Sequence, residues 1–144
     1  MTTDVVISAL RGIAAKNDGL LKPEDVVEAA RPPKSPLHDR FTWDDSEAAR
    51  QFRLVEARNL IRTTIQYVKV GDEDRSFRVF CSLSPDREED GGGYRETVAV
   101  LENKAYREQL LADALAELKT FETRYTRLQE LAGVLKEIRK VLAA

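Results

Sequence analysis

The sequence predicts a mostly α-helical fold of the α+β class: an N-terminal helical segment, a central β-hairpin, and a long C-terminal helix forming a bundle or coiled coil. Apolar residues recur at helical spacing near both ends of the chain, whereas they alternate with polar residues in the middle. The 144 residues are the usual size of one domain. We therefore expect one domain overall, built from residues 1–62, 63–96 and 97–144.

Two short helices are expected at the start of the chain, between Thr3 and Arg31. Apolar residues repeat at helical spacing in the first of them: Val5, Val6, Ala9, Leu10 and Ile13. The run 17–19, Asn-Asp-Gly, ends this helix because Asn and Gly tolerate the left-handed backbone of a C-terminal cap. Pro23 fits the first position of the second helix, since proline has no N–H to leave unbonded there.

A proline-rich stop separates these helices from a short piece that carries two aromatic residues. Residues 32–36, Pro-Pro-Lys-Ser-Pro, cannot continue a helix. Phe41 and Trp43 follow within a few residues, and we expect both to anchor the chain by docking onto neighbouring helices. The only histidine, His38, lies in the same piece, and a bond to a backbone carbonyl or a helix cap is its expected role.

A third helix is expected from about Ser46 to Arg62. Thr42 or Asp44 is the expected N-cap, because short oxygen-bearing side chains accept the first free N–H groups of a helix. The apolar positions predict a buried face made of Ala49, Phe52, Val55, Ala57, Leu60 and Ile61.

The central segment changes to the pattern of β-strands. Residues 63–70 have strand composition, residues 71–74 form a turn, and Phe77, Val79, Cys81 and Leu83 alternate with polar residues. A two-stranded hairpin is marginal alone, so it must lie on the helices or pair with a strand of another subunit. Residues 84–93, acidic and glycine-rich, are expected to be a mobile loop, and residues 94–96 a third short strand.

The C-terminal segment, Lys104 to Leu142, predicts one long helix with a heptad pattern. Its apolar stripe is wider than a two-residue seam, which suits a helix that packs on its own domain and on a partner. We therefore expect a homo-oligomer, with a dimer favoured. The expected contact residues are Leu111, Leu118, Phe121, Tyr125, Leu128, Leu135 and Leu142.

Few residues carry the chemistry of a catalytic or metal site. One histidine and one cysteine cannot make a zinc site or an internal disulfide. Asp44 and Asp45 are adjacent, which rarely provides the spaced oxygens that a hard cation needs. The glycines of 91–93 do not follow a strand and open a helix, so they predict a linker and not a phosphate loop. We expect no enzyme activity, no cofactor and no metal.

The charge pattern leaves nucleic acid open as a partner. The net charge of −2 gives no overall attraction to DNA or to a membrane surface. A cluster of basic residues could still contact phosphates: Lys34, Arg50, Arg53, Arg58 and Arg62. Acidic residues nearly neutralise the same stretch, so a solvated helix with internal ion pairs is the equal alternative. No apolar run approaches the length of a membrane span, which predicts a cytoplasmic protein without a membrane partner.

One block of the sequence is distinctive. Residues 35–53 read SPLHDRFTWDDSEAARQFR, and LLADALAEL and LQELA follow at 110–118 and 128–132. The block resembles small bacteriophage and prophage proteins that share SPLHDxFxWDDSxAA and a leucine-rich C-terminal helix. The resemblance implies a viral or prophage origin and a bacterial cytoplasm, but no catalytic residue.

Two functions follow from the residues and this resemblance together. The first is a non-catalytic, DNA-associated accessory or regulatory protein that acts as a homo-oligomer. The alternative is a protein-interaction module, an adaptor or inhibitor of a host or phage protein. A structural component of the virion is a third interpretation.

Overall fold

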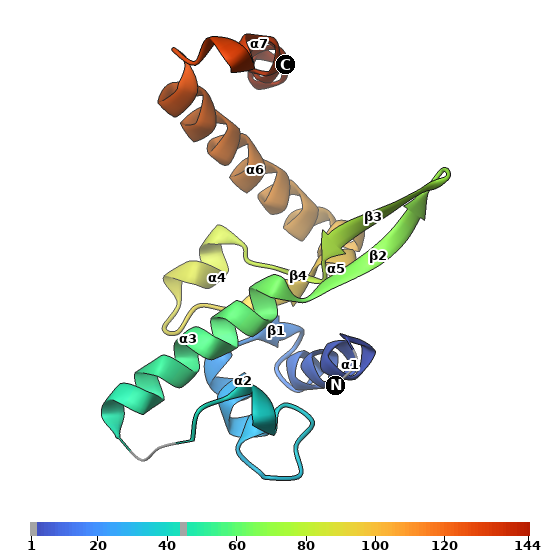
Figure 1. Ribbon diagram of the computed structural model, residues 1–144. Helices are drawn as coiled ribbons and strands as arrows, with labels where there is room; N and C mark the ends of the chain where they lie inside the picture. Colours follow the sequence, from blue (N-terminus) through green and yellow to red (C-terminus); the bar gives the residue numbers. More distant parts are fainter. Residues whose placement is uncertain (1–2, 44–45) are drawn as a thin grey trace. The chain divides into compact units, whose positions relative to one another are not determined.

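The chain folds into two compact units, Met1–Glu102 and Asn103–Ala144. The computed structural model describes residues 3–43 and 46–144 (Figure 1). Helices dominate both units, and two small sheets lie in the first, which confirms the mostly α (α+β) class. The first two segments predicted from the sequence thus belong to a single unit.

Unit 1 begins with the two predicted helices, α1 (Thr3–Ala15) and α2 (Pro23–Ala30). Asp18 and Gly19 have φ angles of 52° and 84°, the left-handed backbone that the sequence predicts for this turn. Strand β1 (Leu20–Leu21) follows the turn, and Pro23 lies in the first turn of α2. This part of the prediction is confirmed.

A short 3-10 helix, η1 (His38–Arg40), precedes the long helix α3 (Glu47–Thr63). The side chain of Ser46 caps α3, because its hydroxyl oxygen accepts a hydrogen bond from the Ala49 N–H at 3.1 Å. The predicted cap at Thr42 is wrong, and Asp44 lies outside the described residues. The Thr42 hydroxyl and N–H both donate to the Glu56 carboxylate, at 3.1 and 3.0 Å.

The buried face of α3 differs from the predicted one. Phe52 and Val55, predicted to be buried, are 52% and 45% exposed. The buried residues of α3 are Arg53, Ala57 and Ile61, which are spaced at four-residue intervals. Such spacing places them on one side of the helix, one turn apart.

The predicted hairpin is formed by β2 (Ile65–Val70) and β3 (Glu73–Arg78), which pair antiparallel from Ile65–Arg78 to Val70–Glu73. In Figure 1 it projects from the end of α3. The alternation to Leu83 does not continue the same strand, because β4 (Phe80–Cys81) belongs to a second sheet.

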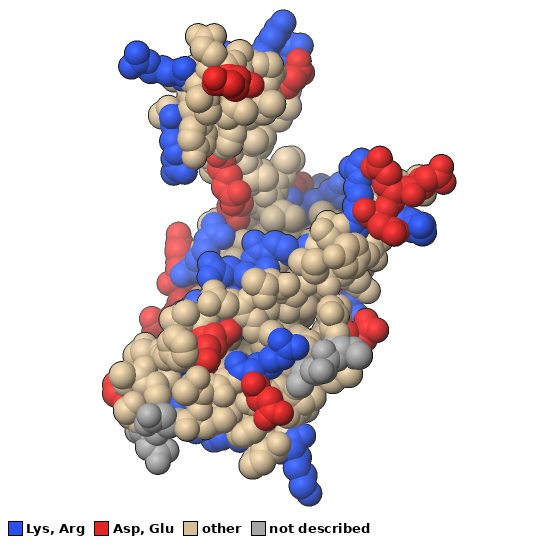
Figure 2. All heavy atoms as spheres, in the orientation of Figure 1, with Lys and Arg blue, Asp and Glu red and all other residues tan. Residues whose placement is uncertain are grey.

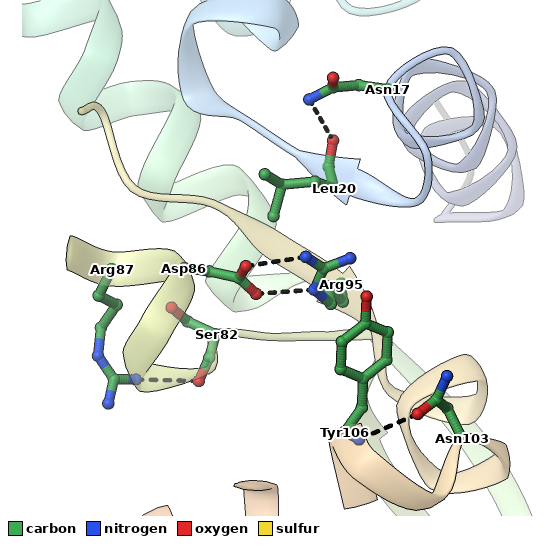
Figure 3. A network of polar contacts seen from close by, with 8 residues as sticks. All are labelled: Asn17, Leu20, Ser82, Asp86, Arg87, Arg95, Asn103 and Tyr106. Atoms are coloured by element: carbon green, nitrogen blue, oxygen red, sulfur yellow. Dashed lines mark hydrogen bonds and ion pairs between the residues drawn. The ribbon is translucent and has the colours of Figure 1, made fainter. Parts of the chain in front are cut away.

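The second sheet has the strand order β1-β5-β4, with the predicted third strand, β5 (Tyr94–Glu96), in the centre. The segment predicted as a mobile loop begins as a helix, α4 (Ser84–Glu88), so that prediction is wrong. Asp86 of α4 accepts two hydrogen bonds from Arg95 of β5, both at 2.8 Å (Figure 3). This bidentate pair, 10% and 15% exposed, fixes α4 against the sheet. Helix α5 (Thr97–Glu102) completes unit 1.

One hydrophobic core holds unit 1 together. It collects side chains from α1, β1, α2, the 37–41 segment, α3 and β4. Its largest fully buried members include Leu10, Leu21, Leu37, Ile61 and Phe80. Phe80 was not singled out by the alternating pattern, although it is fully buried.

Unit 2 consists of α6 (Lys104–Tyr125), η2 (Gln129–Leu131) and α7 (Ala132–Ala143), so the predicted single helix is wrong. Leu128 has an extended backbone, with φ −86° and ψ 100°, which ends the helical path. The hydroxyls of Thr120 and Thr123, toward the end of α6, donate to backbone carbonyls one turn back. Bonds of this kind slightly destabilise a helix. The turn lets α7 pack on α6 and bury Leu135 and Ile138, which are 1% and 7% exposed.

Candidate interaction surfaces

Trp43 lies at the centre of the distinctive block. Its ring stacks on His38, with centroids 5.0 Å apart and planes 9° from parallel, and it is tilted against Phe41 at 5.8 Å. The guanidinium carbons of Arg31 and Arg53 lie 5.4 and 5.3 Å from the centroid of the Trp43 ring. The ring therefore joins the chain after η1 to α2 and α3, which is the anchoring role that the sequence predicts.

Hydrogen bonds fix the same cluster. The Trp43 indole N–H donates to the His38 carbonyl at 2.9 Å. His38 Nδ1 lies 2.9 Å from the Ala30 carbonyl oxygen, so this nitrogen carries the proton in that bond. The backbone-bonding role predicted for His38 is confirmed, and the ring holds the end of α2 to η1.

The five basic residues predicted for nucleic acid do not form one surface. Lys34 and Arg50 are exposed, and Arg58 is half-buried. Arg53 is 5% exposed, and its Nη1 donates to the Thr42 carbonyl at 3.3 Å. Arg62 donates to the Asn59 side chain at 2.7 Å.

Helix geometry separates two of these arginines further. Arg53 and Arg62 are nine positions apart, which is about two and a half turns of α-helix. They therefore point to opposite sides of α3. Arg53 packs inward beside Trp43, whereas Arg62 is exposed on the outer side.

A small cavity of about 170 Å³ lies between α2 and α3. Its charged lining residues are Glu24, Glu28, Arg31 and Arg50. The Arg31 side chain, 3.0 Å from the Glu28 carboxylate, lowers the pKa of that carboxyl through a hydrogen bond. Side chains of opposite charge therefore line the cavity and partly neutralise one another. Such a lining is typical of a packing interface between helices and not of a reaction centre.

The seven residues predicted for self-association divide into two groups in unit 2. Leu135 is buried, and Leu118, Phe121, Tyr125 and Leu142 are half-buried. Leu111 and Leu128 are 60% and 45% exposed. The first group is thus at least partly buried within the chain, whereas the second is exposed.

The polar contacts of α7 with the rest of unit 2 lie toward the C-terminal end of α6. Arg139 of α7 contacts Glu122 at 3.9 Å and donates to the Thr126 hydroxyl at 3.2 Å. None of the 22 residues of α6 is buried. An apolar stripe continues toward the N-terminal end of this helix through Leu115 and Leu111, and we call these two residues, with Ala114, the α6 stripe.

Other exposed apolar side chains lie on unit 1, where the sequence pattern did not indicate them. Phe52 and Val55 lie on the outer side of α3, three positions apart. Tyr67, Val68 and Val70 of β2 are 69%, 46% and 50% exposed. The predicted hairpin could have indicated that these β2 side chains are exposed, since two strands alone cannot cover their own faces.

Cys81 is the only cysteine of the chain. Cys81 is half-buried, and burial raises the pKa of its thiol, which keeps the less reactive protonated form. Within residues 3–43 and 46–144, no group of three His, Cys, Asp or Glu side chains could hold a metal ion. In the same ranges, every helix is too short or too polar to cross a membrane.

Comparisons with known proteins add no relative. No family model matches the chain, and neither a curated protein nor a solved structure matches it.

Proposed function

We propose that the protein is a non-catalytic interaction module that self-associates through unit 2 and presents unit 1 to a further protein. The observation that carries this proposal is the exposure of Leu111, which is the N-terminal residue of the α6 stripe and is 60% exposed. A leucine contributes roughly 1.5–3 kcal/mol when it is fully buried. A second chain that covers the stripe would recover much of that free energy.

The lengths of the two helices explain why one chain does not cover the stripe. Helix α6 has 22 residues and α7 has 12, or about 33 and 18 Å at about 1.5 Å per residue. Even if it were fully aligned, α7 would reach only part of α6. Its contacts with Glu122 and Thr126 lie near the end of α6, several turns from Leu111.

The occupant that we propose for the stripe is the same stripe of a second copy. Two-fold pairing lets one apolar surface meet an identical one, and it is the commonest form of homo-oligomer. Ala114 lies between the leucines and allows the two helices to approach closely. The proposed contact is thus between copies of α6, while α7 packs on the C-terminal end of each.

The test is molar mass by light scattering over a dilution series. The wild-type chain is expected to associate and to dissociate on dilution, whereas Leu111→Asp with Leu115→Asp is expected to have a lower molar mass than the wild type at each concentration. Ala116→Asp is the matched control, because Ala116 is exposed on the opposite side of α6 and should leave the dimer intact. A wild-type chain that remains monomeric at the highest concentration would overturn the proposal.

The outer side of α3 is the part of unit 1 that we propose for a protein partner. Phe52 is 52% exposed and Val55 45%, and aromatic residues such as phenylalanine are enriched at protein interfaces. Phe52→Ser should leave the fold and the mass unchanged but weaken partner capture. This adaptor role suits the alternative function inferred from the sequence.

DNA association is the second candidate, and basic side chains on unit 1 support it. Figure 2 shows Lys and Arg side chains gathered over the region of α4 and the C-terminal half of α3. Lys34, Arg50 and Arg62 are exposed, so they are available to phosphates. Arg53 is left out of this proposal because it packs against Trp43.

Salt separates the two candidates. Binding through phosphates should weaken steeply as salt rises, whereas an apolar protein contact should change little. Changing Lys34, Arg50 and Arg62 to Gln together should lower the DNA affinity and reduce the salt slope. An unchanged affinity in this folded variant would exclude the DNA candidate.

A further inference from the structure

We propose that the free edge of β2 is a second contact site, at which β2 of one chain pairs antiparallel with β2 of a second copy. The two hairpins would then form one four-stranded sheet, with the two copies of Ile65–Val70 as its central strands. This contact is separate from the α6 stripe and does not rest on it.

The composition of β2 makes its edge suitable for strand pairing. The strand reads IQYVKV, with one charged residue, and Tyr67, Val68 and Val70 are 69%, 46% and 50% exposed. An exposed apolar edge strand is a ready template for another strand, and proteins usually protect such edges with charge or proline. Lys69 is the one charge on β2, and Asp74 of the same hairpin lies 3.3 Å from its ammonium group. The β2 edge is therefore close to neutral.

The other edge of the hairpin is unsuitable for the same role. Strand β3 reads EDRSFR, with four charged residues among six. Thr97 also occupies the base of that edge, because its hydroxyl donates to the Arg78 carbonyl and its N–H to the Val79 carbonyl, both at 2.8 Å. A strand that added to β3 would meet Thr97, whereas no described backbone group outside the hairpin bonds to residues 65–70.

The hydrogen-bond pattern shows which groups of β2 face the free edge. The Val79 N–H donates to the Thr64 carbonyl at 3.1 Å, so Thr64 faces the β3 side. Successive residues of an antiparallel strand direct their N–H and C=O groups to alternate sides. Ile65, Tyr67 and Lys69 therefore direct theirs to the free edge.

Only one antiparallel register uses all three of these residues within the strand. It centres the two-fold axis on Tyr67, so that Tyr67 faces Tyr67 of the second copy and Ile65 faces Lys69 of the second copy. Aromatic pairs directly opposite one another stabilise antiparallel strands, and no like charges face each other in this register. A shift that centred the axis on Lys69 would place two ammonium groups opposite each other, which is destabilising. The edge of β2 is thus complementary to itself.

A cysteine at the proposed axis tests the contact directly. Directly opposite residues of this kind have Cα atoms about 5.5 Å apart, within the range that a disulfide spans. In a Cys81→Ser background, Tyr67→Cys should form a covalent dimer under oxidised glutathione much faster than Ser76→Cys. Ser76 is the matched control, because it pairs with Tyr67 inside the hairpin but lies on β3. Equal rates for the two variants would overturn the proposal.

Charge exchange at the same position identifies the occupant. Tyr67→Glu and Tyr67→Lys should each lose the contact, because like charges would meet across the axis. An equimolar mixture should regain it, with a mass by light scattering above that of either variant alone. Each measurement is made in the full chain and in the Leu111→Asp, Leu115→Asp chain, so that pairing of α6 cannot produce the result. A mixture that behaves as the sum of its components would show that β2 does not pair with a second copy.

Discussion

Replacing Trp43 with alanine should destabilise unit 1 by about 3–5 kcal/mol, the range seen for loss of a large aromatic side chain from a core. Several contacts contribute to this cost. The indole N–H bond to the His38 carbonyl is worth about 1 kcal/mol, and the stacking on His38 and Phe41 a similar amount each. Cation–π contacts with Arg31 and Arg53 add roughly 0.5–1 kcal/mol apiece, since both guanidinium groups lie over the ring.

Urea denaturation followed by far-ultraviolet circular dichroism measures this change. Trp43 is the only tryptophan, so its fluorescence follows the wild-type transition but is absent from the variant. Trp43→Phe is the control: it keeps an aromatic ring and loses the indole N–H, so it should cost about 1–2 kcal/mol. Wild-type stability in Trp43→Ala would refute the anchoring role and make Trp43 a candidate ligand contact.

Three further predictions concern the polar and thiol groups of unit 1. Asp86→Ala should destabilise by about 3 kcal/mol, because it leaves Arg95 largely buried without its carboxylate; the midpoint of urea unfolding measures this. The pKa of Glu28, measured by carboxyl NMR, should lie below its ordinary value and should rise in Arg31→Gln. The Glu28–Arg31 contact therefore adds a small stabilisation at neutral pH, which is lost as the pH falls through the lowered pKa. Cys81 should react with a disulfide reagent at pH 8 more slowly in the folded chain than in urea, since burial raises the pKa of its thiol.

Local signals in the sequence are sufficient for the first helices and the hairpin. Gly19 takes the positive φ that ends α1, and Pro23 begins α2. Both features depend on the residue itself and its immediate neighbours. The turn at 71–72 and the strand composition of residues 63–70 act in the same way, because the two strands of the hairpin are adjacent in the chain.

The face of α3 depends on a distant partner and was not predictable from periodicity. Phe52 and Arg53 are adjacent, and the apolar scale alone places the phenylalanine inside. The structure buries the arginine because its aliphatic stem and guanidinium pack beside Trp43 and bond to the Thr42 carbonyl. Tertiary packing of the amphipathic side chain outweighs the hydrophobicity of its neighbour.

The break after α6 was not predictable from the sequence for a different reason. The apolar spacing continues through Leu128 and Leu131, since the stripe on α7 resumes in nearly the same phase. Periodicity reports which residues share a face but not whether the axis of the helix changes direction. Helix α4 was missed because Asp86 is stabilised by Arg95, nine residues later in the chain.

The order β1-β5-β4 has a consequence for how the chain folds. The central strand, β5, pairs on one side with Leu20 and Leu21, so two strands separated by more than seventy positions must meet before this sheet exists. Contacts between distant positions carry a large loop-closure cost and slow folding. A nascent chain that has not yet exposed Tyr94 can form α1, α2 and α3, but it lacks the strand that joins β1 to β4. Fragments that stop before β5 should therefore remain open and sensitive to proteases, and unit 1 should become resistant as a whole only once its last strand has left the ribosome.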